Sequence, residues 1–92
     1  MKAKVSDLVV GEVYRFAPHM PDKSKLKLPL HPQRGNSSTL LGYLEQRECF
    51  LLLDHQRSEL DPKRWFLHVL GSKQVGFVSV YEGSVGSGFE AL

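Results

Sequence analysis

The chain has 92 residues, of which 41% are hydrophobic and 24% are charged, and its formal net charge is +2. This length allows one globular domain and leaves no room for a second. No apolar run approaches the roughly 18 residues of a membrane-spanning helix, and the single cysteine excludes an intrachain disulfide and a cysteine-built zinc site. No apolar stretch follows the lysines near the amino terminus, so we expect no secretory signal, no membrane partner and a cytoplasmic location.

Apolar residues that alternate with polar ones predict short β-strands and almost no helix. The first strand is expected at 12–16, after at most one helical turn at 6–9. Four further extended runs follow at 39–45, 48–54, 64–70 and 74–81. The run 48–54 is nearly all apolar, which is typical of a strand covered on both faces. Five short strands predict an all-β fold closed into a small barrel, because closure removes strand edges that promote aggregation.

A long basic segment, 17–38, separates the first predicted strand from the second. It holds four of the five prolines of the chain, and its four basic residues against one acid give it a net charge of +3. Connections of this length inside a domain are usually functional or disordered. Two interpretations stay open: a solvated polar loop, or a basic surface beside a binding site. The Gly- and Ser-rich segment 83–92 is interpreted as a flexible tail, which leaves 1–82 as the single domain.

The aromatic residues of the predicted strands stand where one known fold family has them. In chain order they are Tyr14 and Phe16 in the first strand, the pair Trp65 and Phe66 at the start of the fourth, and Phe77 and Tyr81 in the last. Over about residues 11–81, the chain resembles the Src-homology-three-like barrel. The resemblance implies a five-stranded small barrel with a long basic, Pro-rich loop, here 17–38, after the first strand.

The same resemblance implies a binding groove. Tyr14, Trp65 and Tyr81 would line this groove, between the long loop and the polar segment 55–63. In the family, acidic residues of the long loop pair with basic residues beside a proline-rich ligand. The loop is basic here, so the resemblance implies the fold and does not imply that ligand.

The sequence carries no pattern typical of a catalytic or metal centre. The four histidines, His19, His31, His55 and His68, are scattered, whereas a zinc site needs several ligands that converge. Cys49 lies in the most apolar run, where we expect a buried, unreactive thiol. The glycine patterns of nucleotide-binding loops and the serine-hydrolase motif are absent from the sequence. We therefore predict no enzyme, no cofactor and no metal site.

The strongest candidates for function are aromatic and basic residues. The candidate binding residues are Tyr14, Phe16, Lys23, Lys25, Lys27, Arg34, Trp65 and Tyr81. The rings would be apolar anchors in the groove, and the charges would attract and orient an acidic partner. These residues predict a non-enzymatic protein-interaction module, such as an adaptor, an inhibitor or an assembly subunit, that binds an acidic or apolar partner surface. For Trp65, the alternative of a core position stays open.

Binding of nucleic acid is the alternative function. Unpaired bases would stack on Trp65 and on Tyr43 or Tyr14, while the basic loop neutralises phosphates. A net charge of +2 is a modest attraction for a polyanion, and the basic residues are densest in the loop rather than among the aromatic residues of the strands. A protein partner is therefore the preferred prediction. The chain is expected to be a monomer, or a dimer formed through an exposed edge strand.

Overall fold

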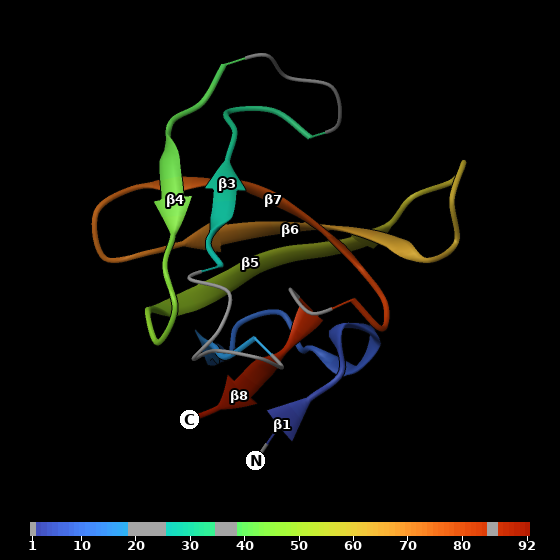
Figure 1. Cartoon of the computed structure of the whole chain (residues 1–92), viewed down its shortest axis with the longest axis horizontal. Helices are drawn as coiled ribbons and strands as arrows, with labels where there is room; N and C mark the ends of the chain where they lie inside the picture. Colours follow the sequence, from blue (N-terminus) through green and yellow to red (C-terminus); the bar gives the residue numbers. More distant parts are fainter. Residues whose placement is uncertain (1, 19–25, 35–38, 85–86) are drawn as a thin grey trace.

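The computed structural model describes residues 2–18, 26–34, 39–84 and 87–92 (Figure 1). These residues form eight short strands and one 3-10 helix of three residues, η1 (Val5–Asp7). The strands are β1 (Lys2–Ala3), β2 (Val13–Phe16), β3 (Leu28–Leu30), β4 (Gly42–Leu44), β5 (Cys49–Arg57), β6 (Arg64–Leu70), β7 (Val75–Tyr81) and β8 (Phe89–Ala91). The prediction of an all-β fold with almost no helix is confirmed for the described residues.

Six strands form one antiparallel sheet in the order β1-β8-β2-β5-β6-β7, and β3 pairs with β4 in a second sheet. All five predicted strands are present, as β2, β4, β5, β6 and β7. β5 continues to Arg57, beyond its predicted end at residue 54, because a register shift between Leu52 and Asp54 keeps the polar residues after it paired with β6. β1, β3 and β8 were not predicted, since two or three residues are too few to show an alternating pattern.

The predicted closed barrel is not formed, because neither sheet closes on itself. β3 meets the edge strand β7 at one isolated bridge, in which the N–H groups of His31 and Phe77 donate to each other's carbonyl oxygens at 2.9 and 2.8 Å. The next hydrogen-bonded position of this antiparallel ladder would join Pro29 to Ser79. Pro29 has no N–H to donate, so the ladder stops after one bridge. Figure 1 shows β3 and β4 crossing the strands of the larger sheet.

Two predicted irregular segments contain strands. The segment 17–38 was predicted to be one long loop, and this is wrong for Leu28–Leu30, which form β3. The predicted flexible tail, 83–92, is wrong for Phe89–Ala91, because β8 pairs with both β1 and β2. The ring of Phe89 is fully buried and lies 5.9 Å from that of Phe16. The Gly- and Ser-rich residues before β8 concealed this last core position.

The two faces of the central strands differ in burial. Their inward side chains are Leu52 in β5, Trp65, Leu67 and Val69 in β6, and Val78 and Val80 in β7, and they form the core with Leu28, Leu30 and Leu44 of the second sheet. The alternate residues point the other way, to a side of β5, β6 and β7 that we call the outer face. Since burial alternates along β5, the prediction that it is covered on both faces is wrong, and Cys49 is exposed rather than buried.

Candidate functional site

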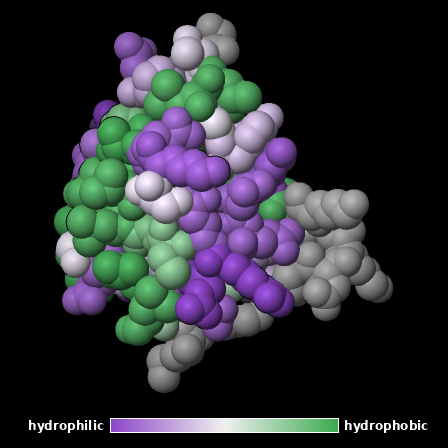
Figure 2. Space-filling model, turned by 90° about the vertical axis from the view of Figure 1, so that its left-hand side faces the viewer, coloured by the Kyte–Doolittle hydropathy of each residue, from purple (hydrophilic) through white to green (hydrophobic). Residues whose placement is uncertain are grey.

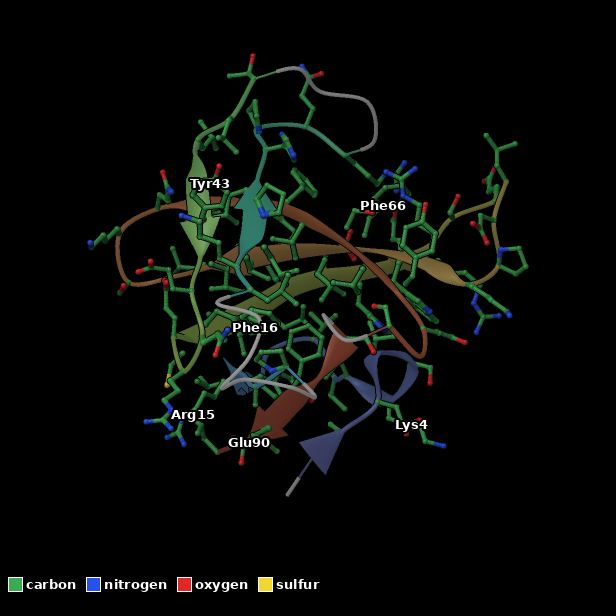
Figure 3. All side chains as sticks on the ribbon, in the orientation of Figure 1. Lys4, Arg15, Phe16, Tyr43, Phe66 and Glu90 are labelled. Carbon is green, nitrogen blue, oxygen red and sulfur yellow. The ribbon has the colours of Figure 1, made fainter. Side chains whose placement is uncertain are left out.

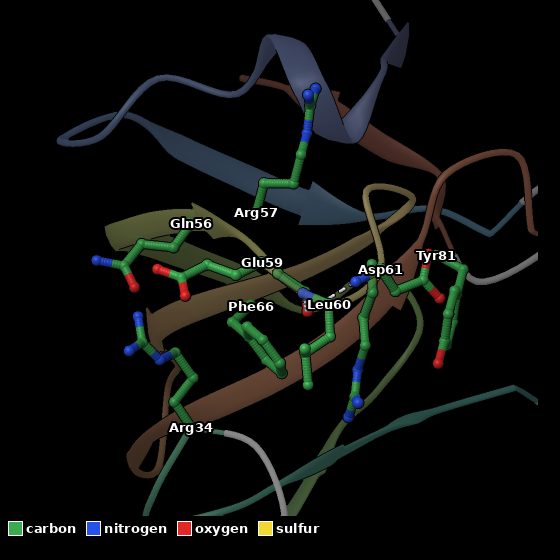
Figure 4. Close-up of a pocket in the computed structure, with 10 residues that line it drawn as sticks. Arg34, Gln56, Arg57, Glu59, Leu60, Asp61, Phe66 and Tyr81 are labelled. Atoms are coloured by element: carbon green, nitrogen blue, oxygen red, sulfur yellow. Dashed lines mark hydrogen bonds between the residues drawn. The ribbon is translucent and has the colours of Figure 1, made fainter.

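A cavity of about 720 Å³ opens between the segment that follows β3 and the loop that joins β5 to β6 (Figure 4). Gln56, Phe66 and Tyr81 reach it from the outer face, residues 58–61 from the loop, and Arg34 from the segment after β3. Arg57 and Arg64 complete its three arginines. We call this site the arginine cavity.

Arg64 is the best-fixed cation of the arginine cavity. Its Nε–H donates a 2.7 Å hydrogen bond to the hydroxyl of Ser79. Its guanidinium carbon lies 4.8 Å from the ring centre of Phe66 and 5.9 Å from that of Tyr81. The ladder between β6 and β7 produces this arrangement, because it pairs Arg64 with Tyr81 and Phe66 with Ser79. The two terminal NH₂ groups of Arg64 are thus held in place without a carboxylate partner among the described residues.

The guanidinium of Arg57 interacts with groups outside the cavity. Its guanidinium lies over the ring of Trp65, at 4.7 Å, and a terminal nitrogen lies 3.7 Å from the carboxylate of Glu82. Figure 4 shows its side chain directed away from Arg34 and Phe66. This is the only ion pair within the part of the chain that the structure describes. Arg34 and Arg64 are therefore the cations of the cavity that form no ion pair within the described residues, and Glu59 and Asp61 are its acids.

The loop beside the cavity, residues 58–63, is held in place by hydrogen bonds of its own polar groups. The hydroxyl of Ser58 accepts hydrogen bonds from the backbone N–H groups of Leu60 and Asp61, at 3.2 and 3.3 Å. The N–H of Arg64 donates to the carbonyl of Asp61 at 3.0 Å. This turn holds the side chain of Leu60 97% exposed at the cavity. Leu60 is therefore an apolar side chain that a ligand in the cavity could contact.

Three of the predicted aromatic anchors lie in the core. Tyr14, Phe16 and Trp65 are buried, and Figure 3 shows Phe16 in the interior among the strands. The prediction that Tyr14 and Trp65 line a groove is therefore wrong. Trp65 and Phe66 are neighbours in β6 and point to opposite faces. The alternation favours Trp65 inside, because it shares its face with Leu67 and Val69. Phe66 shares its face with Arg64 and His68. The structure places Trp65 inside and Phe66 on the outer face.

Of the other predicted binding residues, two line the arginine cavity and one lies outside it. Tyr81 is exposed and lines the arginine cavity with Arg34. Lys27 is exposed outside the cavity, with its ammonium 4.1 Å from the ring centre of Tyr43. Lys23 and Lys25 lie outside the described residues. The cavity itself lies where the groove was expected, between the long segment and 55–63.

Sequence reasoning missed Arg64, Phe66 and Leu60 as members of the site. The predicted strands 64–70 and 74–81 leave three residues, 71–73, for their connection, which would pair Arg64 with Val80. The structure connects β6 and β7 through four residues, 71–74, and this register places Arg64 opposite Tyr81, which was a predicted binding residue. Leu60 gave no signal, since an isolated leucine in a polar loop has no periodicity to interpret.

The described residues offer no group of three or more His, Cys, Asp and Glu side chains that would hold a metal ion. Within the same residues, no helix has the length and apolar character needed to cross a membrane. No known protein family, curated protein or solved structure matches this chain.

Proposed function

We propose that the chain is a non-enzymatic protein-interaction module that binds an acidic segment of a partner protein in the arginine cavity. The observation that carries this proposal is the placement of Arg64, whose guanidinium is held between two rings with its terminal donors unpaired. A guanidinium fixed in this way loses little freedom when a carboxylate binds.

The chemistry of the cavity suits a carboxylate. Two N–H donors of one guanidinium match the two oxygens of a carboxylate, and such charge-assisted hydrogen bonds are stronger than neutral ones. The rings of Phe66 and Tyr81 exclude water from one side of Arg64, which strengthens the attraction. Arg34 supplies a second cation to the same cavity, and Leu60 an apolar contact beside it.

The Src-homology-three-like assignment belongs to the same proposal. It is supported by the presence of the five predicted strands in their predicted order and by a cavity between the long segment after β2 and the loop after β5. An adaptor, an inhibitor and an assembly subunit all require such a docking site, so the role within a larger assembly follows from the partner.

Nucleic acid is the second candidate ligand, because cations and aromatic rings lie in one place. Stacking of bases requires ring faces that are open. Arg64 already covers a face of Phe66, and Lys27 covers a face of Tyr43. We therefore favour a carboxylate that bonds to the edge of the guanidinium over a base that competes for the rings.

The experiment captures partners from a cell extract on the immobilised full-length chain, with and without nuclease. The test variant is Arg34→Gln with Arg64→Gln, and the matched control is Arg47→Gln, which removes a cation from the turn between β4 and β5. We expect a protein that binds the wild-type chain and the control but not the test variant, and that resists nuclease. Captured species that disappear with nuclease would assign the cavity to nucleic acid, and equal capture by all variants would contradict the site.

A further inference from the structure

An apolar row crosses the outer surface of the larger sheet. Val13, Leu51, Leu70 and Val75 are successive neighbours across β2, β5, β6 and β7. Leu92 lies beside Val13, since its N–H donates to the carbonyl of that residue at 3.4 Å. All except Leu51 are classed among the exposed large apolar residues, and Leu51 is half-buried. We call these five residues the apolar row.

The apolar row lies at the end of the sheet where β5 begins, β6 ends and β7 begins, on the left of Figure 1. Figure 2 views the molecule from that side and shows a band of apolar residues. A monomeric protein seldom leaves several large apolar side chains side by side in water without a partner for them.

The apolar row and the arginine cavity share one face. Along β6 the outward residues are Leu70, His68, Phe66 and Arg64, so the row and the cavity are about 20 Å apart at the rise of an extended strand. The space between them carries aromatic rings: His68 stacks on Phe77 at 4.2 Å, and Phe66 follows. The face thus changes from aliphatic to aromatic to cationic along one strand.

We propose that this face binds a single extended partner segment lengthwise, with an acidic residue at Arg64 and Arg34 and apolar residues on the apolar row. This inference rests on the proposed function and adds the second half of the partner's chemistry. In an extended segment, the acidic and apolar residues would be about six positions apart.

Charge complementarity favours such a segment over a second copy of the chain. A second copy would present the same arginines to this face. It offers the carboxylate of Asp54 from the paired strands and those of Glu59 and Asp61 from the loop of the cavity, together with its own arginines. An acidic segment from another protein neutralises Arg34 and Arg64 without bringing further cations.

The test uses labelled synthetic peptides that act as rulers. Each carries a glutamate pair and a leucine pair, separated by Gly-Ser spacers of about one, five or ten residues. Fluorescence anisotropy measures their binding to the full-length chain. The spacer of about five residues reaches both ends of the face and is expected to bind about tenfold tighter than the shortest, which reaches one end only.

Matched variants separate the two ends. Leu70→Ser is compared with Leu40→Ser, because these side chains are similarly exposed, at 45% and 48%, and Leu40 lies before β4 in the other sheet. Leu70→Ser is expected to weaken the middle peptide about fivefold and to abolish the spacer preference. Arg64→Gln is expected to weaken all three peptides about tenfold, and Arg47→Gln to change none of them.

The outcomes distinguish this inference from the proposed function. Binding that depends on Arg64 but not on Leu70 or on the spacer would overturn the lengthwise segment and leave the acidic site. Binding that depends on neither residue, or no binding of any peptide, would contradict both. Sedimentation of the chain alone is the last arm: a dimer that Leu70→Ser dissociates would assign the apolar row to a second copy and overturn the inference.

Discussion

The indole N–H of Trp65 donates a 2.7 Å hydrogen bond to the carboxylate of Glu82, from a residue that is only 7% exposed. His55 stacks on the indole ring at 4.3 Å, and the guanidinium of Arg57 lies on it at 4.7 Å. Trp65 is therefore part of the core, and its neighbour Phe66 is the ring that we propose contributes to binding.

We expect Trp65→Ala to lower the free energy of unfolding by about 3–5 kcal/mol, since it leaves a cavity in the core. Tyr81→Ala, on the outer face, is the control and should stay within about 1 kcal/mol of the wild type. Urea unfolding followed by circular dichroism measures both. A Trp65→Ala protein as stable as the control would contradict the core position of Trp65 and favour a role in binding.

Tyr14 is expected to be structural as well. Its hydroxyl accepts a 2.7 Å hydrogen bond from the backbone N–H of Val9, which fixes the segment before β2. Tyr14→Phe removes this acceptor and should lower stability by about 1 kcal/mol, with faster hydrogen exchange at the amide of Val9. The matched change Tyr43→Phe, on an exposed ring, should alter neither quantity. Equal behaviour of the two variants would contradict the role of the Tyr14 hydroxyl.

The docking of β8 depends on a close approach of two backbones. Ala17 donates its N–H to the carbonyl of Gly88 at 2.9 Å, and a Cβ on Gly88 would overlap the carbonyl oxygen of Ala17. Gly88→Ala should therefore lower stability by more than about 2 kcal/mol and expose the amides of β8 to exchange. Gly83→Ala is the control: its φ of 78° strains an alanine, by about 1 kcal/mol, but the space around it is open. A smaller effect at Gly88 than at Gly83 would contradict the docked strand.

Pro29 is expected to be the reason why β3 does not continue its ladder with β7. Pro29→Val supplies the missing N–H donor opposite Ser79, on a residue whose side chain is exposed. The new amide should become protected from hydrogen exchange, while stability changes by less than about 1 kcal/mol, because the added bond is offset by the greater freedom of the unfolded chain. Exchange at residue 29 as fast as in a free peptide would show that another constraint separates the strands.

Alternation of apolar residues was enough to predict the all-β class and every strand longer than three residues, but the predicted closure into a barrel was wrong. It could not predict β3 and β8, because a strand of three residues shows too little of a period and β8 follows glycines that are typical of a linker. The pairing of Arg64 with Tyr81 could not be predicted, because the predicted connection 71–73 is one residue shorter than the observed one, 71–74, and a shift of one residue changes every cross-strand pair. The choice between Trp65 and Phe66 could be predicted, since Trp65 alternates in phase with the apolar residues Leu67 and Val69.

The most direct measurement of the central claim is a nuclear magnetic resonance titration of the isotope-labelled full-length chain with the peptide that has the middle spacer. We predict that the largest shifts appear at the amides of 64–66 and 79–81, together with Leu70 and Val75, and that the Arg64→Gln protein needs about tenfold more peptide to reach them. Shifts confined to the neighbourhood of Lys27 and Tyr43, or unchanged in the Arg64→Gln protein, would contradict it.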